Sequence, residues 1–318
     1  MIVIEPTPPS DGPDALAHVL ASPPGARLAE PDQVAAFLNY LELSRLEWKL
    51  WRCRDGSEST AHLLVLFLPG QTALFMLPAL ETRGVRPDHQ GQIVLEIVKQ
   101  LADKDLYFYQ TLIEPEATGK RQIIVQAGFQ HLTRLIYLQR VVNAGMRRER
   151  NSPGIVWTAY SADTHRDFAQ ILPATYEDSA DCPELSDLRP IEAVIAAHKA
   201  AGAFDPTLWE IARHKDVPAA CLLLAHHPHG DMMEIVYLGV TRCHRKLGIG
   251  GALLRRALDR CREREIGTLT AVVDERNAPA RRLYARYAFK AAAAREAFLL
   301  IPSGARELRD RVSKNTDI

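Results

Sequence analysis

Between residues 234 and 261 the spacing of hydrophobic positions changes from that of a strand to that of a helix. Residues 234–240 are rich in β-branched and aromatic side chains, which predicts a strand. A basic, glycine-rich segment follows, and beyond it apolar side chains recur at helical spacing. The apolar stripe consists of Leu253, Leu254, Ala257, Leu258 and Cys261. The chain therefore passes from strand to helix through a turn with few Cβ atoms.

This turn has the composition of an anion site. A helix start leaves backbone N–H groups without partners, and the helix dipole favours negative charge there. Glycine also lets a ligand approach the backbone closely, because it has no Cβ atom. We therefore expect the turn to bind a diphosphate. The residues concerned are Arg245, Lys246, Leu247, Gly248, Ile249, Gly250 and Gly251.

Three phosphate-binding motifs compete for the turn. A P-loop needs a lysine after its glycines, whereas Lys246 precedes them. A dinucleotide fingerprint of the form GxGxxG, started at Gly248, has Leu253 in its sixth place. The third motif, R/Q-x-x-G-x-G/A, is matched in full by Arg245, Gly248 and Gly250. A glycine-rich connection without a ligand remains the alternative.

A second motif follows the first. Residues 277–289 read NAPARRLYARYAF and resemble N-x-x-A-x-x-L-Y-x-x-x-G-F, with Ala288 where the motif has glycine. In this order the two motifs resemble the GNAT superfamily of N-acetyltransferases, over residues 153–302. The resemblance implies that the turn holds the diphosphate of acetyl-CoA, the co-substrate. Asn277 is suited to cap the helix and is also a candidate cofactor contact.

The hydrophobic pattern recurs along the chain at an offset of 160 residues. The matching pairs are Gly91 and Gly251, Ile93 and Leu253, Leu101 and Cys261, Glu114 and Asp274, and Phe129 and Phe289. This shared spacing predicts an internal duplication, with an accidental match of two ordinary strand–helix units as the alternative.

The two copies differ at the turn. Asp88 stands opposite Gly248 at this offset, and a slip of one residue puts His89 there instead. A carboxylate or a ring at that place opposes a diphosphate, so we expect the first copy to be a degenerate GNAT-like unit that does not bind CoA and packs on the second. The fold class that we predict is α/β (α+β mixed sheet). It comprises two tandem GNAT-like acyl-CoA N-acyltransferase folds, each a mixed, mostly antiparallel sheet flanked by helices. In layout only, this resembles the mycothiol synthases.

The composition of the chain between the copies suggests where they divide. Residues 146–153 are charged and end in a proline, which is typical of a linker. We therefore predict a degenerate unit over 1–145, a linker over 146–153, a catalytic unit over 154–302 and a charged tail over 303–318. Other predictions include a loop over 176–189, a helical stretch over 206–213 and a hairpin turn over 226–231.

Overall composition narrows the function classes. The chain has 318 residues with Lys+Arg and Asp+Glu both at 39, so no global basic field attracts nucleic acid or an anionic membrane. The longest apolar run, over residues 63–68, is far shorter than the ~20 residues that span a bilayer. The five cysteines show no CxxC spacing, which disfavours a disulfide framework or a zinc site. We expect no metal, no signal peptide and a cytoplasmic location.

Acetyl transfer to an amine needs a base for the amine proton and an acid for the departing thiolate. A carboxylate suits the first role, and by its spacing before Val240 the resemblance points to Glu234. The resemblance likewise assigns the acid to Tyr284, with Tyr287 more typical of a core aromatic. It also implies that backbone at Leu238, Gly239 and Val240 meets the pantetheine arm. An exposed strand glutamate and a buried core tyrosine are the alternative interpretations.

The acceptor is suggested by charge alone. Acidic residues gather after the first helix of the second copy, so we predict a small-molecule primary amine, cationic if this loop lines the site. The loop residues are Glu177, Asp178, Asp181, Glu184 and Asp187. His226, His227 and His229 are expected in a solvated turn without a metal. We favour direct attack in a ternary complex; a non-catalytic acyl-CoA sensor and a nucleotide-dependent oxidoreductase are the rivals.

Overall fold

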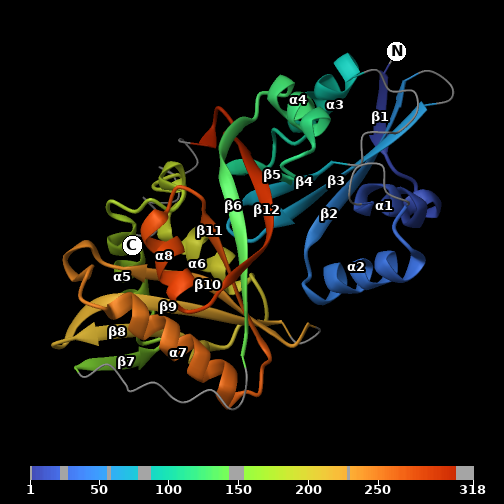
Figure 1. The fold of residues 1–318 in the computed structure, drawn as a ribbon. Coiled ribbons are helices and arrows are strands. Elements are labelled where there is room, and N and C mark those ends of the chain that lie inside the picture. Colours follow the sequence, from blue (N-terminus) through green and yellow to red (C-terminus); the bar gives the residue numbers. More distant parts are fainter. Residues whose placement is uncertain are drawn as a thin grey trace. The chain divides into compact units, whose positions relative to one another are not determined.

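The computed structural model describes residues 2–21, 28–55, 59–77, 87–142, 154–227 and 230–305 (Figure 1). Contacts divide the chain into two compact units. The first comprises Met1–Leu132 together with Arg295–Ile318, and the second comprises Thr133–Ala294. The second unit contains both GNAT-like motifs.

The second unit is built on a mixed sheet in the order β6-β11-β10-β9-β8-β7. Neighbouring strands are antiparallel except for the central pair β10–β11, which is parallel. The strands are β6 (Gln130–Val141), β7 (Ile155–Ala159), β8 (Trp209–His214), β9 (Val217–His227), β10 (Met232–Val240) and β11 (Thr268–Asp274). This is the mixed, mostly antiparallel sheet that the sequence predicted.

Helices cover both faces of this sheet. One hydrophobic cluster contains the predicted stripe of α7 together with Tyr284 of α8. The other contains Phe168 and Leu172 of α5 and Ile195 of α6. The helices are α5 (His165–Tyr176), α6 (Ile191–Lys199), α7 (Ile249–Glu263) and α8 (Ala278–Arg286). The sheet therefore has an α7/α8 face and an α5/α6 face.

The first unit repeats this plan, with strands in the order β1-β2-β3-β4-β5-β12. Its strands are β1 (Ile2–Pro6), β2 (Glu47–Asp55), β3 (Ser59–Leu68), β4 (Thr72–Met76), β5 (Phe108–Ile113) and the end of β12 (Lys290–Leu300). Its helices are α1 (Gly12–Leu20), α2 (Pro31–Leu43), α3 (Pro87–Gln100) and α4 (Thr118–Gln126). Since α4 begins at Thr118 and α8 at Ala278, the predicted offset of 160 residues is found in the structure.

Each unit completes its sheet with a strand from the other half of the chain. Strand β6, from the first copy, pairs with β11 from Leu135 to Val141. The end of β12, from the second copy, pairs with β5 from Glu296 to Leu300. The boundaries between the two compact units thus lie at 132/133 and 294/295. The division predicted from the sequence was based on the composition of a linker over residues 146–153. These residues lie outside the described ranges.

The predicted helix over residues 206–213 is wrong, because most of this segment is strand β8. Trp209 and Ile211 point to the α5/α6 face, and Glu210 is buried on the other side by Arg256 and Arg260 of α7. Leu208, Ile211 and Ala212 stand at helical spacing in the sequence, and the apolar–polar–apolar run Trp209–Ile211 is too short to decide for a strand. His226 and His227, expected in a turn, lie in strand β9 instead.

Candidate acyl-transfer site

The parallel pair at the centre of the second sheet is incomplete. Strands β10 and β11 pair from Met232–Thr268 to Ile235–Ala271, and within the described residues their ladder includes no later pair. Strand β10 nevertheless runs on to Val240, paired with β9 along its other edge and irregular in register between Ile235 and Tyr237. An irregularity of this kind bends and twists a strand. The backbone edge of Leu238–Val240 is thereby available to an extended ligand.

The expected turn follows directly after β10 and starts helix α7. Gly248 is its N-cap at φ +80°, and a Cβ placed there would meet nothing within 4 Å. Ala252 N donates to Gly248 O at 3.2 Å, and among the described residues no acceptor is recorded for the N–H groups of the three preceding residues, Ile249–Gly251. Buried Ile249 holds the turn in the core. Free amides, a helix dipole and open space at Gly248 together fit a diphosphate.

The next two glycines are explained by helix packing. A Cβ at Gly250 would lie 3.0 Å from Leu283 Cδ2, and one at Gly251 would lie 2.8 Å from Tyr287 Oη. Both partners belong to α8 or its C-cap. These glycines therefore let α8 pack closely on the first turn of α7, which brings the second motif against the anion site.

Arg245 uses its side chain inside the protein. Its guanidinium donates to backbone carbonyl oxygens at the end of β10 and at the end of α5. The acceptors are Val240 O at 3.2 Å, Thr175 O at 3.1 Å, Glu177 O at 2.5 Å and Asp178 O at 2.9 Å. Arg245 thus fixes the turn to helix α5. The next residue, Lys246, lies at φ +64°, and the described residues show no ion pair for its side chain.

Gly239 is needed for contact with the same helix. A Cβ at Gly239 would lie 2.6 Å from Thr175 Oγ1 and 2.7 Å from Thr175 Cβ, and a rotation of the threonine side chain would not relieve the second contact. Thr175 Oγ1 also lies 2.7 Å from Tyr237 Oη and donates to Leu172 O at 2.6 Å. Helix α5 therefore packs directly on the part of β10 whose other edge is open.

Tyr284 lies on α8 and is buried at 6% exposure. Its ring packs edge-on against Phe289, with centroids 5.1 Å apart. Burial, with a smaller contribution from the negative charge of Asp181, raises the pKa of the Tyr284 hydroxyl above its ordinary value. The phenol therefore keeps its proton throughout the neutral range. Asn277 accepts the N–H of Ala280 at 3.1 Å, so its expected capping role is confirmed.

Glu234 lies on the other face of the sheet. Its neighbours Met233 and Ile235 pack towards α7, so strand alternation directs Glu234 to the α5/α6 face. Its Oε2 atom is 2.8 Å from His227 Nε2, and both side chains are a little over a quarter exposed. This carboxylate is within reach of solvent, as a proton acceptor that works directly or through water has to be, and it also contacts a neighbouring imidazole.

Asp274 ends strand β11 and is completely buried. Burial opposes its ionisation, but hydrogen bonds from Arg276, from Thr133 Oγ1 at 2.7 Å and from the N–H of Cys182 at 3.1 Å outweigh this effect. They lower the pKa of Asp274 to about 2. The opposite holds for Asp181, whose pKa is raised by burial although it accepts the N–H of Asp274 at 3.1 Å.

The other acidic residues of the loop over 177–189 are partly neutralised. Glu184 makes two hydrogen bonds with Arg276, at 2.5 and 2.9 Å, and Asp178 Oδ2 lies 3.0 Å from Arg242 Nε. The loop is therefore held to the second motif and to the turn by ion pairs, and Asp181 is the loop carboxylate whose negative charge acts on Tyr284.

The histidines of the β9–β10 connection form no metal centre in the described structure. His227 contacts Glu234, His226 lies in β9, and His229 lies outside the described residues. Within the described ranges, no group of three or more His, Cys, Asp or Glu is arranged to hold a metal ion. Likewise, none of the helices described is long and apolar enough to cross a membrane.

Sequence reasoning missed several residues of this site. Arg276 and Thr133 bind Asp274, which the sequence marked only as a strand end, and His227 was assigned to a turn. A carboxylate followed two residues later by arginine at a strand end is the one local signal that points to Asp274 and Arg276. Thr133 comes from a strand of the other copy, and nothing in its surroundings in the sequence indicates its partner.

A mixed sheet with an interrupted parallel pair, next to a helix start with free backbone amides, is typical of the GNAT fold. Residues 172–289 match the model of the acetyltransferase (GNAT) family. This stretch is therefore a GNAT-family domain, and the match supports acyl transfer as its general activity. No curated protein matches the chain.

Solved structures of the same class cover nearly the whole chain. A GCN5-related N-acetyltransferase from Sphaerobacter thermophilus gives a TM-score of 0.65 at 16% identity, over 94% of this chain and 95% of that one. A tandem GNAT protein from the clavulanic acid biosynthesis pathway gives 0.54 at 14% identity, over 95% and 100%. A GCN5-related N-acetyltransferase from Kribbella flavida gives 0.52 at 18% identity, over 86% and 96%. The predicted tandem GNAT fold is thus confirmed.

Proposed function

We propose that the protein is an acetyl-CoA-dependent N-acetyltransferase whose second unit performs the reaction. The observation that carries this proposal is the free amides of Ile249–Gly251, beside the open edge of Leu238–Val240. A diphosphate on the amides, with an extended arm along the strand edge, accounts for both features. The acyl-CoA co-substrate supplies an activated thioester, and the remaining chemistry belongs to the protein.

The proposed roles follow from the two faces of the sheet. On the α5/α6 face, Glu234 accepts the proton of the amine, directly or through water, and His227 holds its carboxylate. The amine nitrogen bonds to the thioester carbonyl carbon, and the carbon–sulfur bond breaks. Tyr284, on the α7/α8 face, gives its proton to the departing sulfur. Backbone N–H groups of Leu238–Val240 offer donors for the carbonyl oxygen.

The acceptor that we propose is a small primary amine. Asp181 supports this choice, since it is the carboxylate of the loop over 177–189 whose charge reaches Tyr284. A protonated amine is attracted by such a group and has to lose its proton before attack, since an alkylamine has a pKa of ~10.4. Direct attack is favoured over a cysteine relay. Cys182, the cysteine of this loop, has its pKa raised by burial and by Asp181, which suppresses the thiolate.

Release of free thiol from acetyl-CoA, measured against a panel of small amines and alcohols, tests this function. An amine that raises thiol release far above the rate without acceptor is the expected result. Binding of acetyl-CoA without turnover on any acceptor would instead identify a sensor, and an alcohol as the preferred acceptor would overturn amine specificity.

A further inference from the structure

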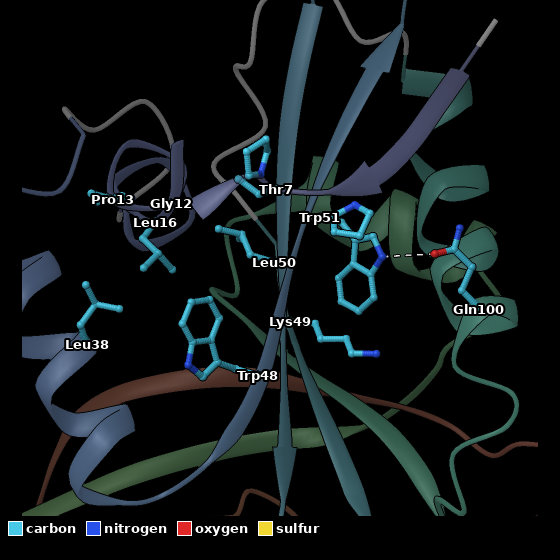
Figure 2. A pocket seen from close by; sticks show the side chains of 12 residues that line it. Thr7, Gly12, Pro13, Leu16, Leu38, Trp48, Lys49, Leu50, Trp51 and Gln100 are labelled. Carbon is cyan, nitrogen blue, oxygen red and sulfur yellow. Dashed lines mark hydrogen bonds between the residues drawn. The ribbon is translucent and has the colours of Figure 1, made fainter. Parts of the chain in front are cut away.

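The first unit contains a cavity of about 610 Å³ that belongs to neither GNAT motif. It lies where β1 ends at Pro6, opposite Trp51, while β2 continues to Glu47 without that neighbour (Figure 2). Helices α1 and α2 close one side, through Leu16 and Leu38. Its volume is in the range of small-molecule sites, which measure roughly 300–1,000 Å³.

The equivalent place in the second unit is filled by aromatic rings. There Tyr160 N donates to Trp209 O at 2.9 Å, directly after strand β7, and the Tyr160 ring packs on Trp209, Phe168 and Phe204. In the first unit the same backbone bond joins Thr7 N to Leu50 O, also at 2.9 Å. Threonine thus stands where the other copy has tyrosine.

Among the described residues, the side chain of Thr7 makes no hydrogen bond that would explain the choice of threonine. Its Oγ1 atom is buried and has no partner among the described residues. A small side chain with an unsatisfied hydroxyl therefore replaces a packed ring, and the space is left open. The cavity is partly open to solvent, so a small molecule can reach it.

The cavity is lined asymmetrically. Figure 2 shows Trp48 beside Leu38 and Leu16, whereas Lys49 and Trp51 lie on the side of Gln100. Trp51 Nε1 donates to Gln100 Oε1 at 3.2 Å, which fixes the indole. Lys49 is the only charged residue among the twelve that line the cavity, and no ion pair is recorded for it in the described structure.

We propose that this cavity binds a small organic acid with a flat aromatic or apolar body. The body packs between Trp48 and the side chains of α1 and α2, and the acid group lies toward Lys49. Indole faces and aliphatic side chains favour such a body, and a single unpaired ammonium at one end favours an anion over a cation. This site is separate from the acyl-transfer site and does not depend on the function proposed for it.

Calorimetric titration of the full chain with 2-naphthylacetate, a flat aromatic acid, tests the proposal. The uncharged 2-naphthylacetamide is its matched control. We expect the acid to bind and the amide to bind more weakly, by a factor of up to about five, since an exposed charge pair is worth roughly 0.2–1 kcal/mol. Silence of both probes, or equal affinities, overturns the proposal.

Two variants locate the binding. Thr7→Phe fills the cavity as the second unit does and is expected to abolish binding of 2-naphthylacetate, whereas Thr7→Ser retains it. Lys49→Met leaves the cavity open and is expected to reduce the affinity for the acid to that for the amide, so the proposal stays testable where Thr7→Phe does not fold. Unchanged affinity in Thr7→Phe or in Lys49→Met, or loss of binding in Gly248→Val, contradicts the assignment.

Discussion

The carboxylate of Asp181 accepts the backbone N–H of Asp274 at 3.1 Å, and the Asp274 carboxylate accepts the N–H of Cys182 at the same distance. These reciprocal bonds tie the loop between α5 and α6 to the end of β11. Since Asp274 pairs with β6 on its other side, the loop closes the far end of the open edge between β10 and β11. The fully buried Asp274 therefore holds the loop between α5 and α6 in place at the end of the site.

Asp274→Asn is expected to lower the free energy of unfolding by about 2 kcal/mol at pH 7, because it removes the negative charge that hydrogen bonds from Arg276, Thr133 and the N–H of Cys182 stabilise. The lowered pKa of Asp274 makes this contribution dependent on pH. A carboxyl group whose pKa is depressed on folding stabilises the protein above its ordinary pKa of 3.8 and loses that effect as pH falls through about 2. Urea unfolding of both proteins between pH 2 and pH 7 measures the difference.

The matched control is Glu184→Gln, which removes the other carboxylate on Arg276. Because the Glu184 side chain is 46% exposed, its loss should cost no more than about 1 kcal/mol. A stability difference between wild type and Asp274→Asn that stays the same at pH 2 and pH 7 contradicts the account of Asp274.

Tyr284→Phe is expected to reduce kcat about 100-fold, in line with loss of a general acid, and to leave acetyl-CoA affinity within about twofold. Tyr287→Phe is the control on the same helix end, since Tyr287 Oη accepts Arg255 Nη1 at 2.5 Å and serves packing. Steady-state kinetics and calorimetry separate the two effects. Equal losses of kcat in both variants would show that the phenol of Tyr284 is structural.

Glu234→Gln is expected to lower kcat/KM for the amine, most strongly at neutral pH. As pH rises toward the amine pKa of ~10.4, more acceptor is already uncharged and the deficit should shrink. His227→Gln, which keeps the carboxylate, is expected to have a smaller effect. A pH profile of the ratio between wild type and Glu234→Gln measures this, and a ratio constant from pH 7 to pH 9.5 rules out the base.

Ala288 occupies the left-handed region at φ +57°, where its counterpart Gly128 lies at φ +89°. Ala288 stands where the motif has glycine, and the structure shows alanine in the backbone conformation that glycine prefers. Ala288→Gly should therefore raise stability by about 0.5–1 kcal/mol. Gly128→Ala should cost a similar amount, since its Cβ would meet only Leu300 at 3.7 Å. Thermal unfolding measures both; a loss of stability in Ala288→Gly counters this explanation.

Much of the fold could be predicted because it follows from the local spacing of polar and apolar residues. Neighbouring residues alone determine the apolar stripe on α7 and the cap at Asn277. The offset of 160 residues is the distance at which such local patterns recur. The helix expected over 206–213 failed because Glu210 is neutralised by Arg256 and Arg260, 46 and 50 residues away. The exchange of β6 and β12 between the units could not be predicted either. The polar and apolar positions of the two strands are similar, and tertiary packing decides which strand each one pairs with.

In the candidate site too, residues in local motifs could be predicted, whereas contacts between distant segments could not. Gly248 and Tyr284 belong to short motifs, so they could be proposed as site residues from the sequence alone. Arg245 was expected at the ligand as a cation, but carbonyl oxygens of residues 67–70 positions away bind its guanidinium. Such contacts depend on how α5 meets β10, which no local pattern encodes.

The central claim is that the turn at Gly248 binds the diphosphate of acetyl-CoA, and calorimetric titration of acetyl-CoA tests it most directly. Gly248→Val and Gly154→Val form a matched pair, since the two glycines lie at φ +80° and φ +84° and a Cβ at either would meet no atom of the described residues within 4 Å. Both variants should lose a similar stability, about 1–2 kcal/mol. Only Gly248→Val should weaken acetyl-CoA binding, by at least about tenfold, while Gly154→Val binds as the wild type does. Equal affinities in the two variants, or no binding by the wild type, would contradict the claim.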